Sequence, residues 1–195
     1  HGNGCSSSHS VQPAQIFHSH LVAQILEKEE QLSRHSSGAA GAGGGAAGVA
    51  YLAQHPLFEQ LPRLRADFAV PSYCGLGRLQ HVNAWLGTGG TVTPLHFDSY
   101  DNLFAQVVGS KYVRLYPPSE TPKLYARGAE EGGLCAQGNV SEVDVEAPEL
   151  ARHPRFAEAA YEEAVLRPGE LLFIPAGTWH YVRSLSTSWS ISFWF

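Results

Sequence analysis

Two histidines and one carboxylate are the residues of this sequence whose types and spacing best suit metal chemistry. His96 and Asp98 stand two residues apart in Thr91-Val-Thr-Pro-Leu-His96-Phe-Asp98, and His180 follows far downstream in Gly177-Thr-Trp-His180-Tyr. Residues two apart on a β-strand point to the same side, so we predict that His96 and Asp98 reach one metal ion. With His180 they would hold Fe(II) on one face and leave the opposite positions open. A His-X-Asp triplet occurs often by chance, so the elements around it must show whether these residues bind a metal.

Length, composition and charge favour a single globular β-rich domain. The chain has 195 residues, of which 44% are hydrophobic and 11% aromatic, enough for a packed core. The formal net charge of −5 argues against a protein that coats nucleic acid or binds a membrane surface, so we expect neither partner. No run of residues reaches the length of a transmembrane helix. The chain starts with His1 and contains no Met, so we expect a fragment of a longer protein.

The cysteines indicate a reducing compartment. Cys5, Cys74 and Cys135 are odd in number and widely spaced, which is atypical of a disulfide framework. We therefore expect reduced thiols in an intracellular protein, nuclear or cytoplasmic, with the nucleus preferred.

The first 48 residues differ from the rest in pattern. Residues 11–32 repeat apolar positions at helical spacing and predict an amphipathic helix. Residues 36–48 are a Gly/Ala run that buries little apolar surface and predicts a flexible segment. We therefore divide the chain into an incomplete N-terminal flank, residues 1–48, and a catalytic domain, residues 49–195.

Short predicted strands, separated by glycine and proline turns, follow from residue 51 on. Their density favours an all-β dominated fold, a double-sheet jelly roll or cupin-like barrel with a few flanking helices. Gly109-Ser110 suits a tight hairpin turn, so the strands on either side are expected to pair. Helical segments are predicted at 56–61 and near 148–159. The predicted strands are 51–54, 79–86, 91–98, 103–108, 111–116, 161–166, 171–174, 179–185 and 189–195.

Several motifs together resemble the Jumonji C (JmjC) family of Fe(II)- and 2-oxoglutarate-dependent oxygenases. The resemblance covers residues 49–195 and implies a double-stranded β-helix that holds the metal between its two sheets. It implies that His96, Asp98 and His180 are the iron ligands. The motifs are His96-X-Asp98, Lys111-Tyr-Val-Arg-Leu-Tyr116, Pro168-Gly-Glu-Leu-Leu-Phe-Ile-Pro175, Trp179-His180, Tyr51-Leu-Ala-Gln-His55, Asn83-Ala-Trp85 and Ser192-Phe-Trp194.

The same resemblance implies a 2-oxoglutarate site. Lys111 matches the residue that pairs with the distal carboxylate, and Tyr51 and Thr93 match hydroxyl donors to that carboxylate. Asn102 matches an amide near the metal-bound end of the co-substrate. The residues alone leave other interpretations open: Lys111 as an edge-strand lysine that faces water, Tyr51 as a core residue, Thr93 as an ordinary strand residue and Asn102 as a turn residue.

Further residues are candidates for the substrate pocket. Trp85, Trp179 and Trp194 either line the pocket or pack in the core, as large aromatic residues in strands commonly do. Gln54 and Asn83 are weaker candidates for contacts with a peptide.

The resemblance implies an enzyme that uses Fe(II), 2-oxoglutarate and O₂ and releases succinate and CO₂. A protein or peptide would be the substrate, and hydroxylation of a side chain such as arginine is the leading hypothesis. Demethylation of N-methyl-lysine at the same site is the alternative, because the motifs cannot separate the two reactions. A third hypothesis is a cupin-like metal-binding module without catalysis.

Overall fold

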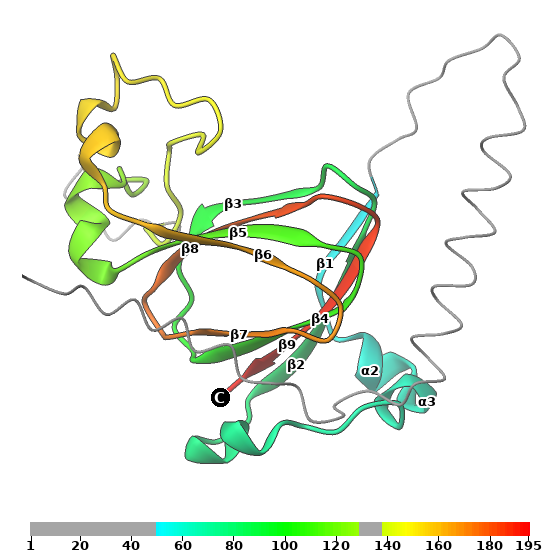
Figure 1. The fold of residues 1–195 in the computed structure, drawn as a ribbon. Helices are drawn as coiled ribbons and strands as arrows, with labels where there is room; N and C mark the ends of the chain where they lie inside the picture. The colour runs from blue at the N-terminus through cyan, green and yellow to red at the C-terminus, as the bar shows by residue number, and fades with distance from the viewer. Residues whose placement is uncertain (1–49, 129–137) are drawn as a thin grey trace, which may run out of the picture.

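Two antiparallel β-sheets face each other in the computed structural model, which describes residues 50–128 and 138–195 (Figure 1). One sheet has the strand order β1-β2-β9-β4-β7 and the other has the order β3-β8-β5-β6. The predicted all-β, cupin-like double-sheet architecture is therefore confirmed. The strands are β1 (Tyr51–His55), β2 (His81–Gly87), β3 (Val92–His96), β4 (Asn102–Val108), β5 (Lys111–Tyr116), β6 (Glu162–Leu166), β7 (Leu171–Ile174), β8 (Trp179–Ser184) and β9 (Ser188–Trp194).

The helices are short and lie outside the sheets. α2 (Leu57–Gln60) confirms the helical turn predicted at 56–61, and α3 (Pro62–Arg65) follows it. Among the described residues, the 3₁₀ helices are η1 (Ser72–Leu76), η2 (Pro118–Lys123) and η4 (Pro154–Glu158). Within the described ranges, no helix is long and apolar enough to cross a membrane.

The helix predicted near 148–159 is wrong in extent, because only η4 forms there. Pro154 disfavours helical dihedrals in the residue before it, and His153 has φ −123° and ψ 55°. The helix and the Gly/Ala segment predicted within residues 1–48 lie outside the described residues.

The central strand β9 alternates serine with large apolar residues, and the two sets face opposite sides of its sheet. Trp189, Ile191 and Phe193 pack in one core cluster with Phe58 of α2. The serine side faces the interior between the sheets, where Ser192 accepts a hydrogen bond from a tryptophan of β2. Small side chains on this side leave room between the sheets.

The predicted hairpin at Gly109-Ser110 is wrong. β4 pairs with β7 and β9, whereas β5 pairs with β6 and β8 in the other sheet, so the turn carries the chain between sheets. Gly109 has φ +68°, and a Cβ there would lie 2.0 Å from the carbonyl oxygen of Thr187. A glycine-containing turn signal reports the local bend but not which strands pair across it.

A long insertion between β5 and β6 covers one end of the sandwich (Figure 1). We call its described parts, residues 117–128 and 138–161, the β5–β6 insertion. Its apolar residues, among them Leu124, Val143 and Phe156, share a core cluster with Trp179 of β8. The insertion is therefore part of the folded domain.

Candidate functional site

The two candidate histidine ligands lie directly opposite each other on neighbouring strands. His96 ends β3 and pairs in register with His180 of β8. β3 is an edge strand of its sheet, and an edge strand tolerates Pro94, a residue that cannot donate to a ladder. An irregularity between Thr93 and His96 shifts the register of the pair, and such bulges re-aim side chains.

Asp98 lies in the loop after β3, because the strand ends at His96 and not at residue 98 as predicted. The loop is held instead by Gly177, whose N–H donates to the carbonyl oxygen of Asp98 at 2.8 Å. Gly177 belongs to the turn that leads into β8. The segments that carry Asp98 and His180 are thus tied together near both residues.

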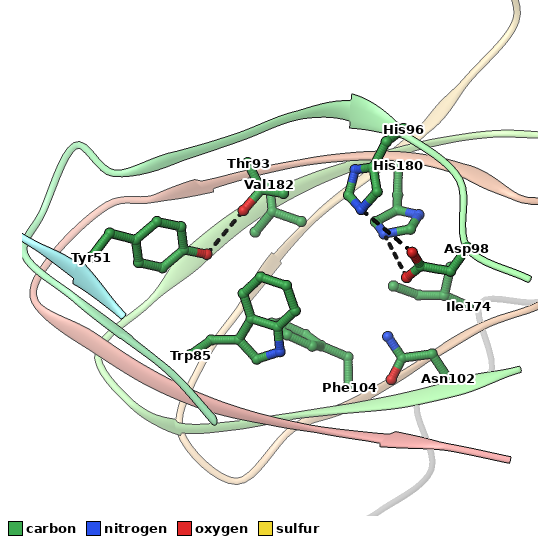
Figure 2. A pocket seen from close by; sticks show the side chains of 10 residues that line it. All are labelled: Tyr51, Trp85, Thr93, His96, Asp98, Asn102, Phe104, Ile174, His180 and Val182. Carbon is green, nitrogen blue, oxygen red and sulfur yellow. Dashed lines mark hydrogen bonds and ion pairs between the residues drawn. The ribbon is translucent and has the colours of Figure 1, made fainter. Parts of the chain in front are cut away.

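The three side chains converge at one end of a pocket between the sheets (Figure 2). Nε2 of His96 lies 3.8 Å from Oδ1 of Asp98, and Nε2 of His180 lies 3.6 Å from Oδ2 of Asp98. Their possible ligand atoms all lie within 4.8 Å of one another. One ion can therefore contact all three, although their role as ligands stays a prediction.

Hydrogen bonds to the backbone set the tautomers of both rings. Nδ1 of His96 lies 2.8 Å from the carbonyl oxygen of Pro94, and Nδ1 of His180 lies 3.0 Å from that of Thr178. A carbonyl oxygen only accepts, so each ring donates its proton from Nδ1 and leaves the Nε2 lone pair free. This arrangement is typical of imidazoles that bind a metal.

Burial also shifts the protonation of this cluster toward neutral groups. It lowers the pKa of His180 to about 3, with a further contribution from His96. It raises the pKa of the Asp98 carboxyl, and His96 opposes that shift. A bound cation would reverse the shift at Asp98, because it favours the ionised carboxylate.

Hydroxyl groups line the other end of the pocket, and Lys111, which is not among the lining residues, lies near the rings of two of them. The Tyr51 hydroxyl lies 2.9 Å from Oγ1 of Thr93 (Figure 2). Lys111 is only 1% exposed, and its Nζ lies 5.7 Å from the centroid of the Tyr51 ring and 5.3 Å from that of Phe104. The interpretation of Lys111 as an edge lysine that faces water is therefore wrong, because β5 lies between β8 and β6.

Two buried polar atoms at this site fit the binding of a dicarboxylate co-substrate. Among the described residues, Nζ of Lys111 and Oδ1 of Asn102 have no hydrogen-bond partner, and burial lowers the pKa of Lys111 to about 7. Buried polar atoms without partners are rare and call for an explanation. A dicarboxylate with one end on Lys111 would explain the unpartnered amine. At the other end of the pocket, two imidazoles with one carboxylate suit Fe(II).

The pocket walls are largely apolar. Trp85 lies between the two ends of the pocket in Figure 2, and its Nε1 donates to Oγ of Ser192 at 2.9 Å. Phe104, Ile174 and Val182 also line the pocket. No signal in the sequence distinguishes these three from other apolar strand residues.

The remaining candidates do not belong to the described lining of the pocket. Trp179 is 0% exposed, packs in the core and donates from Nε1 to Oγ1 of Thr121 at 2.9 Å. Trp194 is buried at the end of β9, and Asn83 is buried in β2. Gln54 is exposed on β1, with φ 48°. Of the three tryptophans, only Trp85 borders the pocket.

Residues 12–195 match the family model described as a cupin-like domain. The chain is 51% identical over 151 residues to "Lysine-specific demethylase 8" of Danio rerio, covering 75% of this chain and 36% of that protein. It is 49% identical over 146 residues to "Lysine-specific demethylase JMJ30" of Arabidopsis thaliana, covering 74% and 33%. It is 38% identical over 151 residues to "Jumonji C domain-containing protein 5" of Drosophila melanogaster, covering 75% and 36%.

The chain spans about a third of the length of these relatives. The chain is also similar to a solved structure of YcfD, a ribosomal oxygenase from Escherichia coli, with 21% identity and a TM-score of 0.38; the match covers 60% of this chain and 23% of that one. From the family match and the curated relatives, the chain belongs to the cupin-like domain family and, within it, to the JmjC proteins.

Proposed function

We propose that the protein is an Fe(II)- and 2-oxoglutarate-dependent oxygenase that acts on a side chain of a protein or peptide. One observation carries this proposal: His96, Asp98 and His180 converge in a pocket that Tyr51 and Thr93 also line. The intracellular and preferentially nuclear location expected from the sequence stays a prediction.

Residues at the two ends of the site have different roles. In this proposal His96, Asp98 and His180 bind Fe(II), and Lys111 with Tyr51 binds the distal carboxylate of 2-oxoglutarate. When bound, the metal and co-substrate together supply O₂ activation: one oxygen atom enters succinate, formed with CO₂, and the other enters a C–H bond of the substrate. The protein positions these groups, and the apolar walls keep water away from them.

Hydroxylation of an arginine side chain is our leading proposal for the reaction. The indole ring of Trp85 lines the pocket between the candidate metal ligands and Tyr51 (Figure 2). A planar guanidinium stacks well on aromatic rings. This aromatic wall supports an arginine substrate without excluding a methylated ammonium.

Demethylation of N-methyl-lysine is the second candidate, and the names of the relatives favour it. Two of the relatives above are named lysine-specific demethylases. The same oxygen insertion at an N-methyl C–H bond gives an N-hydroxymethyl group, which releases formaldehyde and leaves the amine with one methyl group fewer. Both candidate reactions consume one O₂ and one 2-oxoglutarate, so co-substrate turnover cannot separate them.

Mass spectrometry of a mixed peptide library would test the proposal. Peptides with arginine and peptides with methyl-lysine are incubated with the protein, Fe(II), 2-oxoglutarate and O₂, with His180→Ala as the matched control. A gain of one oxygen on arginine, absent with the control, would support the hydroxylase. Loss of a methyl group with formaldehyde would support the demethylase. Metal binding without succinate or modified peptide would favour a non-catalytic module and overturn the proposal.

A further inference from the structure

A residue of the β5–β6 insertion holds the residue between His96 and Asp98. The N–H of Phe97 donates to the backbone carbonyl oxygen of Asn139 at 3.0 Å. Nδ2 of Asn139 donates in return to the carbonyl oxygen of Phe97 at 3.0 Å. Both backbone polar groups of Phe97 are therefore bonded to one residue, which lies 42 positions away in the sequence.

These bonds continue along the free edge of β3. The N–H of Ser141 donates to the carbonyl oxygen of Leu95 at 2.8 Å, and Val140 forms an isolated bridge with His96. The other side of β3 pairs with β8. The insertion thus supplies partners for the edge that the sheet itself leaves open.

The insertion also contacts the segment that carries His180. The Phe97 ring packs edge-on against Trp179, with centroids 4.8 Å apart and an interplanar angle of 72°. Trp179 immediately precedes His180, and its indole N–H donates to Thr121 of the insertion at 2.9 Å. Phe97 and Trp179 therefore link the two segments that carry the candidate ligands, and the insertion fixes both of them.

We infer that Asn139 is a positioning residue for the metal centre: the bond from its side-chain amide to the Phe97 carbonyl oxygen, added to the backbone bond that any residue there could make, sets the direction in which His96 and Asp98 present their ligand atoms. The need for it follows from the end of β3 at His96: beyond that residue the chain is held by the bonds between Asn139 and Phe97 and by the bond from Gly177 to Asp98. Rotation of the backbone at Phe97 would swing Asp98 away from the histidines. The inference rests on the proposed function, since it assumes that these side chains bind a metal.

The test measures metal affinity apart from activity. Mn(II), which replaces Fe(II) without turnover, is titrated into the wild type, Asn139→Ala and Ser141→Ala by calorimetry, and Tm is recorded for each. Loss of a positioning contact around metal ligands typically weakens binding about 10- to 100-fold, so we expect at least a tenfold higher Kd for Asn139→Ala. Ser141→Ala is the control, because its Oγ donates to the Leu124 carbonyl oxygen at 2.6 Å and does not contact Phe97.

A merely structural contact would lower Tm without a specific change in Kd. Wild-type affinity in Asn139→Ala, or equal weakening in Ser141→Ala, would overturn the inference. If Asn139→Ala does not fold, Asn139→Leu, which keeps most of the volume but removes the donor, should show the same rise in Kd. A wild type that binds no Mn(II) would overturn the proposed function and, with it, the inference.

Discussion

Replacement of Lys111 by methionine should stabilise the protein and weaken its binding of 2-oxoglutarate. Lys111 is 1% exposed, and its Nζ has no hydrogen-bond partner among the described residues. Burial lowers its pKa from 10.5 to about 7. Methionine keeps a long apolar side chain, so the change removes the charge and leaves the packing nearly intact.

The sign of the pH effect follows from the two pKa values. Below pH 7 the amine is protonated in both the folded and the unfolded state, so the buried charge lowers the free energy of unfolding by its full amount. Between pH 7 and 10.5 the unfolded chain binds a proton that the folded protein has released, so stability rises with pH. Each unit of pKa difference corresponds to about 1.4 kcal/mol. At pH 7 the variant should therefore gain on the order of 4 kcal/mol in the free energy of unfolding.

Co-substrate affinity should change in the opposite direction. A charge-assisted hydrogen bond is worth about 1.5–3 kcal/mol, so Lys111→Met should weaken 2-oxoglutarate binding about 10- to 100-fold. Because the protonated amine binds the carboxylate, wild-type affinity should fall about tenfold per pH unit above pH 7, and the variant should lose this dependence.

Urea unfolding from pH 6 to 9 and calorimetry of 2-oxoglutarate with the Mn(II)-loaded protein measure the two effects. Lys123→Met is the matched control, since Lys123 is partly exposed and pairs with Glu120 at 2.8 Å. It should alter stability by at most about 1 kcal/mol and leave co-substrate affinity unchanged. A Lys111→Met variant that is less stable than the wild type, or that binds 2-oxoglutarate equally well, would refute the reasoning.

Three further substitutions test the turn, the hydroxyl and the carboxylate. Gly109→Ala should lower the free energy of unfolding, measured in urea, by about 2 kcal/mol or more, because Gly109 has a φ of +68° and an added Cβ would clash with Thr187. Gly90→Ala should lower the free energy of unfolding less, because the Cβ added there meets open space. Thr93→Val should weaken 2-oxoglutarate binding about fivefold and leave Mn(II) affinity unchanged, as calorimetry would show. Asp98→Ala should abolish Mn(II) binding and succinate formation yet keep the wild-type circular dichroism spectrum; retained succinate formation would contradict its assignment as a ligand.

The sequence predicts the strands well where turn residues mark both ends. The bounds of β5 and β7 agree with the predicted ranges, since Gly109 and Pro117 flank β5 and Gly169 and Pro175 flank β7. The sequence does not predict which strands pair. Which strands share a sheet depends on contacts between residues far apart in the chain, so a local glycine signal predicted a hairpin where the chain changes sheets.

The same limit applies to the site. The spacing of His96 and Asp98 predicts that they act together, and the structure brings His180 to them. The sequence does not predict the role of Asn139, because nothing in a polar residue of a loop insertion indicates which residue it contacts. The contact with Phe97 exists only after the insertion has packed on β3.

Core and pocket are built by the same strand, which affects how mutations in β9 should be interpreted. Trp189, Ile191 and Phe193 face one core cluster, whereas Ser192 on the alternate face holds Trp85, a residue of the pocket wall. A change that shifts β9 will therefore alter stability and pocket shape together. Lost activity alone cannot place a β9 residue in the chemistry. The distinction needs metal affinity, co-substrate affinity and the free energy of unfolding for the same variant, because a residue that contacts the site or positions its ligands changes binding out of proportion to its effect on stability.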